Sequence, residues 1–376
     1  MSKARGLADL GNAYSDGALS NRNLIINGGM QVAQRGTSVT GVTGSGNTFS
    51  LDRWVYDGAN SATLTLSQDA DAPDGFNYSL KAQVTTADGA YGSGSDYARI
   101  TQKIEGYNGQ QLGLAESWAK PFVVSFWVKS SVSGGYSCTI YTEPTNEYHN
   151  AGSYQVNTAN TWEYKTVLFS AHSSGSVGNT TNGSNLRVQF QLNKAGPTYS
   201  GTQNTWVNGV VLSGASDQNT WISTTGATFQ ITGVQLEIGD TATPFEHRSY
   251  GQELALCQRY FCTSGGAVVP QYTGHTNDLF VEGVGAVYTN DLAYSNRINW
   301  PVLMRASPTV TIVSSSLCTA DNQAVVYSRN GGWHTCDVTG PNPGTSGMMI
   351  DLRDNGGFVN RDSCMYFVGY YAEAEL

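Results

Sequence analysis

Phe-Val-Val-Ser-Phe-Trp-Val-Lys, residues 122–129, is the stretch that decides the fold. Positions 122, 124, 126 and 128 are all apolar and fall on one face, and Val123, Ser125, Trp127 and Lys129 fall on the other. Because successive side chains of a β-strand point to opposite faces, a period of two places the apolar set on one face. The stretch therefore predicts a β-strand that lies against a core.

The same pattern recurs on both sides of this strand. It predicts further strands at 62–66, 79–84, 162–168 and 186–192, and Asn23–Met30 predicts a first strand that ends in an Asn-Gly-Gly turn. At 229–237 the apolar phase slips by one residue at Thr232-Gly233, which predicts a β-bulge. We expect long loops at 134–152, 170–184 and 196–226, because these segments are dense in Gly, Ser, Thr and Asn.

One segment has the pattern of a helix, Ser249–Phe261. Ser249 and Gln252 have capping-box spacing, and Leu254 and Cys257 fall on one face together with Phe261. After it, short strands are predicted at 281–288, 297–304, 309–313, 323–328 and 364–371. The pattern therefore predicts an all-β chain of two β-domains joined by a short helix.

Composition excludes several classes of function. The 376 residues suffice for two domains, and 44 Gly and 21 Tyr with only 13% charged residues suit turns and pleated sheets. A net charge of −9 without any Lys or Arg block argues against nucleic-acid binding. We also expect no membrane helix and no secretory signal peptide, because no apolar run is long enough. The six cysteines are scattered, which predicts free thiols and no zinc site.

No known catalytic motif is present, and the carboxylates are scattered singly, so we expect no enzyme activity. Glu246 and His247 can be interpreted as an acid–base couple, but we favour a structural joint in which Glu246 pairs with Arg248. Calcium is an alternative at the acidic cluster of Asp69, Asp71 and Asp74. Solvated loop carboxylates are the interpretation that we favour for that cluster, and no other cofactor is expected.

Saccharide binding is the ligand chemistry that the composition favours. Sugars stack on exposed aromatic rings, and amides and carboxylates complete their recognition. Aromatic residues in or beside polar loops are the candidates, together with one histidine that we expect to be exposed: Tyr107, Trp118, Tyr141, Tyr148, His149, Tyr199 and Trp206.

Several motifs resemble bacteriophage tail-fibre and related virion proteins. The matching stretches are Asn23–Thr37 with Leu51-Asp-Arg-Trp54, the strand at 122–129, the long run Ile231–Phe261, and Trp300–Thr311 with the closing Ala-Glu-Ala-Glu-Leu. The opening residues are similar to the N-terminal segment of tail fibres from marine and cyanobacterial phages.

The resemblance implies an N-terminal segment at 1–22 that docks other virion proteins. It also implies a jelly-roll β-sandwich like a carbohydrate-binding module at 23–248, a linking helix at 249–263 and a small C-terminal β-sandwich at 264–376. The resemblance further implies that the protein is a homotrimer of the virion tail, that it recognises host-surface polysaccharide, and that it is assembled in the host cytoplasm. A capsid decoration or head-fibre protein without receptor binding is the alternative, and a depolymerase would need a parallel β-helix whose repeats are absent.

Overall fold

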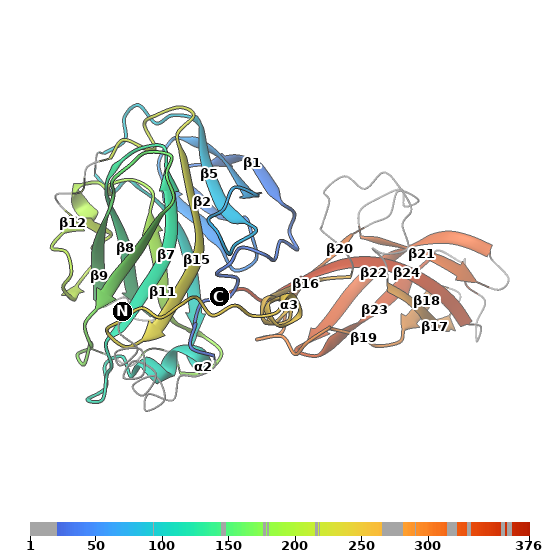
Figure 1. Ribbon diagram of the computed structural model, residues 1–376. Helices are drawn as coiled ribbons and strands as arrows, with labels where there is room; N and C mark the ends of the chain where they lie inside the picture. The colour runs from blue at the N-terminus through green and yellow to red at the C-terminus, as the bar shows by residue number, and fades with distance from the viewer. Residues whose placement is uncertain are drawn as a thin grey trace. The chain divides into compact units, whose positions relative to one another are not determined.

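The computed structural model describes residues 21–92, 94–143, 148–175, 178, 180–214, 217, 219–264, 281–289, 291–313, 322–328, 332–354, 358 and 363–376. The chain divides into two compact units (Figure 1). Unit 1 comprises Met1–Gln31, Thr37–Tyr250 and Leu376, and unit 2 comprises Val32–Gly36 and Gly251–Glu375. The contribution of Val32–Gly36 to unit 2 is not indicated by the sequence pattern.

Unit 1 is a β-sandwich of two antiparallel sheets. The six-stranded sheet has the order β1-β4-β5-β15-β7-β10, namely Ser38–Thr43, Thr63–Asp69, Ser79–Thr86, Thr228–Ile238, Phe122–Ser130 and Glu163–Phe169. The seven-stranded sheet has the order β13-β9-β8-β11-β6-β3-β2, namely Val207–Asn208, Tyr148–Val156, Gly134–Thr142, Ser184–Gln191, Tyr97–Glu105, Val55–Ala59 and Gly46–Phe49. The short strands β12 (Ser200–Gly201) and β14 (Ser213–Gly214) pair in parallel.

The two sheets meet through large aromatic side chains. Phe126 of β7 lies edge-on to Phe190 of β11, with ring centroids 4.9 Å apart, and both are fully buried. Trp54 also contacts Phe190, at 6.3 Å. Since β7 and β11 belong to different sheets, these contacts place the core between the two layers, as the alternation at 122–129 predicts.

The predicted bulge is confirmed at Gly233. The pairing of β15 with β7 shifts register between Thr232 and Gln235, and Gly233 has φ +61°. A Cβ atom at this position would lie 2.7 Å from the Phe76 ring. Position 233 therefore requires glycine for two reasons: the left-handed backbone conformation and the close approach of the Phe76 ring.

Two expectations for unit 1 are wrong. Asn23–Met30 forms no strand: its backbone is irregular, Asn27 has φ +58°, and only single contacts such as Leu24 N to Leu236 O join it to β15. The expected loop at 134–152 is instead built largely from β8 and β9, which pair from Gly134↔Val156 to Tyr141↔His149. Glycine is needed inside this hairpin because a Cβ on Gly152 would lie 2.1 Å from the Val167 side chain.

Unit 2 begins with the expected helix, α3 (Tyr250–Gln258). The strands that follow are β16 (Phe261–Thr263), β17 (Val281–Thr289), β18 (Leu292–Ser295), β19 (Ile298–Asn299), β20 (Thr309–Val313), β21 (Gln323–Ser328), β22 (Gly332–Gly344), β23 (Gly347–Arg353) and β24 (Ser363–Glu373). Among the described residues, neither this helix nor the short α2 (Gly106–Gly109) of unit 1 has the length and apolarity to span a bilayer.

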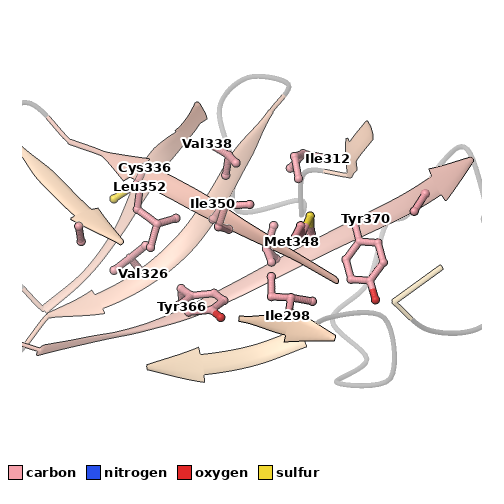
Figure 2. Close-up of a cluster of buried hydrophobic side chains, with 14 of the residues drawn as sticks. Ile298, Ile312, Val326, Cys336, Val338, Met348, Ile350, Leu352, Tyr366 and Tyr370 are labelled. Atoms are coloured by element: carbon pink, nitrogen blue, oxygen red, sulfur yellow. The ribbon is translucent and has the colours of Figure 1, made fainter. Parts of the chain in front are cut away.

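The expected C-terminal sandwich is a small six-stranded barrel. Strands pair in the order β24-β17-β18-β23-β22-β21, and β21 pairs again with β24, which closes the ring. Figure 2 shows the buried side chains inside it, among them Ile350, Leu352 and Tyr366. The second half of β24 continues past the ring and pairs with β20 and β16.

Val32–Gly36 adds one strong contact to unit 2. The guanidinium of Arg35 lies 3.7 Å from the Phe261 ring centroid and forms ion pairs with Glu373 and Glu375 at 3.4 and 3.1 Å. Five of the six cysteines are described, and all five are buried and form no disulfide with one another: Cys138, Cys257, Cys262, Cys336 and Cys364.

Substitution of Gly233 tests the bulge. We expect Gly233→Ala to lower the free energy of unfolding by roughly 2–4 kcal/mol, the sum of left-handed backbone strain and overpacking against Phe76. Gly41→Ala is the matched control, because Gly41 has φ +68° but nothing within 4 Å of its Cβ position. It should cost only about 1–2 kcal/mol, and equal losses in urea unfolding would contradict the role of the Phe76 contact.

Candidate functional site

The candidate site lies at the end of unit 1 where β6 and β8 finish and β9 and β11 start. The pairs Ser184↔Glu105 and Tyr141↔His149 mark this end of the seven-stranded sheet. The chain leaves β6 here through α2 (Gly106–Gly109) and the 3-10 turn η1 (Gln110–Leu112), which Figure 1 shows below the strands. We call the described residues of the segments 106–121 and 170–185 the loop end.

Trp118 presents an exposed ring in a tight turn of the loop end. Its side chain is 53% exposed, and the ring lies directly over Gly113, where an added Cβ would come within 2.6 Å. Gly113 has φ +62° and follows η1, and Lys120 N donates to Leu112 O at 3.0 Å across the turn. One face of the indole therefore packs on the backbone at Gly113, and the rest of the ring is accessible to solvent.

A cavity of about 280 Å³ adjoins this ring. Its lining combines one aromatic ring with amides, a hydroxyl and a carboxylate: Gln110, Gln111, Gly113, Leu114, Glu116, Trp118, Thr180 and Asn185. Such a set offers a flat apolar face beside hydrogen-bonding groups of both kinds. Tyr107 of α2 lies a few residues before this lining in the chain, and its side chain is 55% exposed. Its backbone N donates to Thr181 O at 2.8 Å.

A second aromatic group ties the loop end to the sheet. The His172 ring lies between Tyr148 and Trp206, with centroid distances of 4.3 and 4.4 Å. Trp206 Nε1 donates to Ser170 O at 2.9 Å, and Ala115 N donates to His172 O at 2.8 Å. Burial lowers the pKa of His172. His172 is absent from the predicted set, because nothing in its neighbouring sequence separates it from an isolated histidine.

Tyr141 and His149 are not exposed. They lie opposite each other on β8 and β9, with rings stacked at 4.2 Å and exposures of 8% and 2%. Arg187 covers Tyr141 at 5.0 Å and forms an ion pair with Glu143. The expectation that His149 is an exposed loop residue is therefore wrong, because the loop is a paired hairpin.

Tyr199 lies at the opposite end of the seven-stranded sheet. Its ring contacts that of Tyr97, the first residue of β6, at 6.0 Å. The seven predicted residues thus separate into three settings: Tyr107 and Trp118 exposed at the loop end, four rings packed in two stacks, and Tyr199 apart from them.

The predicted joint residues contact the start of the described chain and β15. Glu246 accepts a hydrogen bond from Asn23 N at 2.9 Å, and Arg248 donates to Ile25 O at 3.0 Å. Glu246 and Arg248 lie 3.6 Å apart. His247 packs its ring against Phe76 at 5.3 Å and against Phe245 at 4.9 Å.

Two carboxylates of the acidic cluster, Asp69 and Asp71, form ion pairs with lysines. Asp69 pairs with Lys81 at 2.8 Å, and Asp71 pairs with Lys129 at 2.5 Å. Asp71 also accepts a hydrogen bond from Trp162 Nε1 at 3.0 Å, and the hydrogen bond from Lys129 is the main cause that holds the pKa of Asp71 below its usual value. Within the described part of the chain, no three His, Cys, Asp or Glu side chains gather as a metal site would require.

No model of a known protein family matches the sequence, and no curated protein matches it. Part of the chain is similar in fold to solved β-sandwiches. A putative sugar-binding protein from Bacteroides thetaiotaomicron has 13% identity and a TM-score of 0.30, with 58% of this chain and 100% of that chain covered. A family 11 carbohydrate-binding module from Clostridium thermocellum, in complex with a mixed-linked tetrasaccharide, has 10% identity, a TM-score of 0.26 and coverages of 55% and 99%.

The enzymatically active domain of tailspike protein 4 from bacteriophage CBA120 is also similar, with 14% identity and a TM-score of 0.31. That match covers 54% of this chain and only 22% of the tailspike chain. These similarities are too distant to indicate a function for this chain.

The burial of His149 predicts a pH dependence of stability. Burial lowers its pKa from 6.5 to about 4. Between these values the unfolded chain binds a proton that the folded chain does not, so stability should fall as the pH drops from 6.5 to 4, by roughly 2–3 kcal/mol for this group. Chemical unfolding at several pH values should give a shallower dependence of stability on pH for His149→Gln than for the wild type. Equal slopes for wild type and His149→Gln would contradict the assignment.

Proposed function

We propose that this chain is a non-catalytic virion protein whose unit 1 binds a host-surface saccharide at the loop end. The observation that carries the proposal is Trp118, whose exposed ring is held on Gly113 beside the cavity of about 280 Å³. A ring fixed in this way loses little side-chain entropy when a sugar stacks on it. The sugar hydroxyls would then reach Gln110, Gln111 and Glu116.

The proposed absence of catalysis is supported by the carboxylates of the site. Glycoside hydrolysis by the common mechanisms needs two carboxyl groups that flank the scissile bond. Glu116 is the single carboxylate among the described residues that line the cavity. Glu143, from the adjoining strand end, is held by the guanidinium of Arg187. Binding without cleavage is the chemistry that these residues favour.

The assignment to a virion is supported by the sequence resemblance at 23–37, 231–261 and 300–311. In this proposal residues 1–22, of which Met1–Ser20 lie outside the described residues, dock another virion protein. The chain would act as a homotrimer on the phage tail, assembled in the host cytoplasm.

Removal of the Trp118 ring tests the saccharide site. We expect Trp118→Ala to weaken retention on purified host-surface polysaccharide by about tenfold, since loss of one stacked ring removes on the order of 1.4 kcal/mol. Tyr164→Ala is the matched control, because Tyr164 is 45% exposed but lies on β10 of the other sheet. Unchanged binding by Trp118→Ala, or no retention of the wild-type chain on any host polysaccharide, would refute the proposal.

Location on the particle tests the virion assignment separately. We expect a labelled antibody against the C-terminal residues to decorate tails in electron micrographs of intact particles. Labelling of heads would instead favour the decoration protein without receptor binding, which has the same folds but requires no saccharide affinity.

A further inference from the structure

A second cavity lies at the other end of β11. It has a volume of about 530 Å³ and is lined by Tyr91, Gly92, Asn193, Lys194, Ala195, Pro197, Ser200, Asn219, Thr220 and Ser223. Asn185 lines the Trp118 cavity and Asn193 lines this one, so eight residues of extended chain separate them. At about 3.3 Å per residue the two cavities lie roughly 25 Å apart, and no lining residue is shared.

Hydrogen bonds fix the three segments that form its walls. Asn193 Oδ1 accepts from Ile222 N at 3.1 Å, which joins the end of β11 to the segment before β15. Ala195 N donates to Ser213 Oγ at 2.9 Å, and Ser200 Oγ donates to Ala195 O at 2.7 Å. Asn219 Nδ2 donates to Gly135 O at 2.9 Å. The cavity is therefore formed before any ligand arrives, which lowers the entropy cost of binding.

The Tyr91 wall is fixed in the same way. Gly92 N donates to Asp96 Oδ2 at 3.0 Å, and Gly196 N donates to Asp96 O at 2.8 Å. Burial raises the pKa of Tyr91 far above its ordinary value, so the phenol stays protonated at every physiological pH. Tyr91 thus contributes an aromatic surface to the cavity and carries no charge there.

The charge of the lining is unusual for this chain. Lys194 is the one ionisable side chain other than Tyr91 among the described lining residues, and none of these lining residues is a carboxylate. The neighbouring carboxylates are those of Asp96, which accepts a hydrogen bond from Gly92 N, and of Asp88; in addition to burial, both act on Tyr91 and raise its pKa. The remaining polar groups are hydroxyls and amides of Ser200, Asn219, Thr220 and Ser223. Hydroxyls and amides bind the hydroxyls of a sugar, and an ammonium group binds an anion.

We propose that this cavity is a second saccharide site, distinct from the loop end, and that it takes an acidic sugar whose carboxylate pairs with Lys194. The ring of that sugar lies against Tyr91, and its hydroxyls reach Thr220 and Ser223. A charged polysaccharide chain that spans roughly 25 Å can then occupy both ends of unit 1 at once, which raises avidity without any new contact.

Calorimetric titration of the full chain tests the second site with two probes of equal length, tetragalacturonate and a neutral galactose tetramer. We expect the acidic tetramer to bind at least fivefold more tightly in 20 mM salt, and this preference to shrink as salt is raised. Lys194→Gln should abolish the preference, because a charge-assisted hydrogen bond is worth about tenfold or more in affinity. Lys194→Arg should keep it.

Two further arms separate this proposal from the one for the loop end. Trp118→Ala should retain the preference for the acidic tetramer even when its affinity for the neutral tetramer falls. Inorganic phosphate at millimolar concentration should not displace the acidic tetramer from Trp118→Ala, because the site recognises the sugar as well as its charge. An unchanged preference in Lys194→Gln with wild-type thermal stability, equal affinities of the wild type for both probes, or displacement by phosphate would each overturn the second site.

Discussion

The contact between Phe126 and Phe190 is the constraint on which unit 1 depends. Phe126 stands in the middle of β7 in one sheet and Phe190 next to the end of β11 in the other, and their centroids lie 4.9 Å apart with both side chains fully buried. The contact anchors β11 close to its Asn193 end, and Leu186 and Val188, which are also fully buried, anchor the rest of the strand, so its two ends project in defined positions. Asn185 at one end and Asn193 at the other line the two cavities, and both candidate sites therefore depend on a strand that is anchored in the core.

The sequence predicts those elements whose two faces differ strongly. β7, β10 and β11 alternate between apolar and polar residues, and the phase slip at Gly233 marks the bulge. β8 and β9 lie in a segment whose content of Gly, Ser, Thr and Asn indicates a loop. Tyr136, Cys138 and Ile140 of β8 are buried, but Ser137 and Thr139 between them are buried as well and donate to Asp217 Oδ2 and Leu212 O. Polar side chains that are buried by partners distant in the chain resemble loop residues in composition.

The limits of prediction at the site have a similar cause. Exposure of Trp118 and Tyr107 agrees with their polar surroundings in the sequence, but the same surroundings wrongly indicate that His149 is exposed. Whether an aromatic residue in a polar segment faces solvent depends on a partner distant in the chain, here Tyr141 across the hairpin. Likewise, the closed barrel of unit 2 follows from the pairing of β21 with β24, which no local pattern specifies.

The position of β24 has a consequence for the order in which unit 2 can form during synthesis. β24 follows the other described strands of unit 2 in the chain and pairs with β17, β21, β20 and β16, so it is the strand that joins the barrel into one sheet. Until Ser363–Glu373 has emerged, β17 and β21 both present unpaired edges, and unpaired edges are templates for aggregation. Unit 2 therefore carries two open edges until β24 has been made, whereas β15, the last strand of unit 1, is made much earlier.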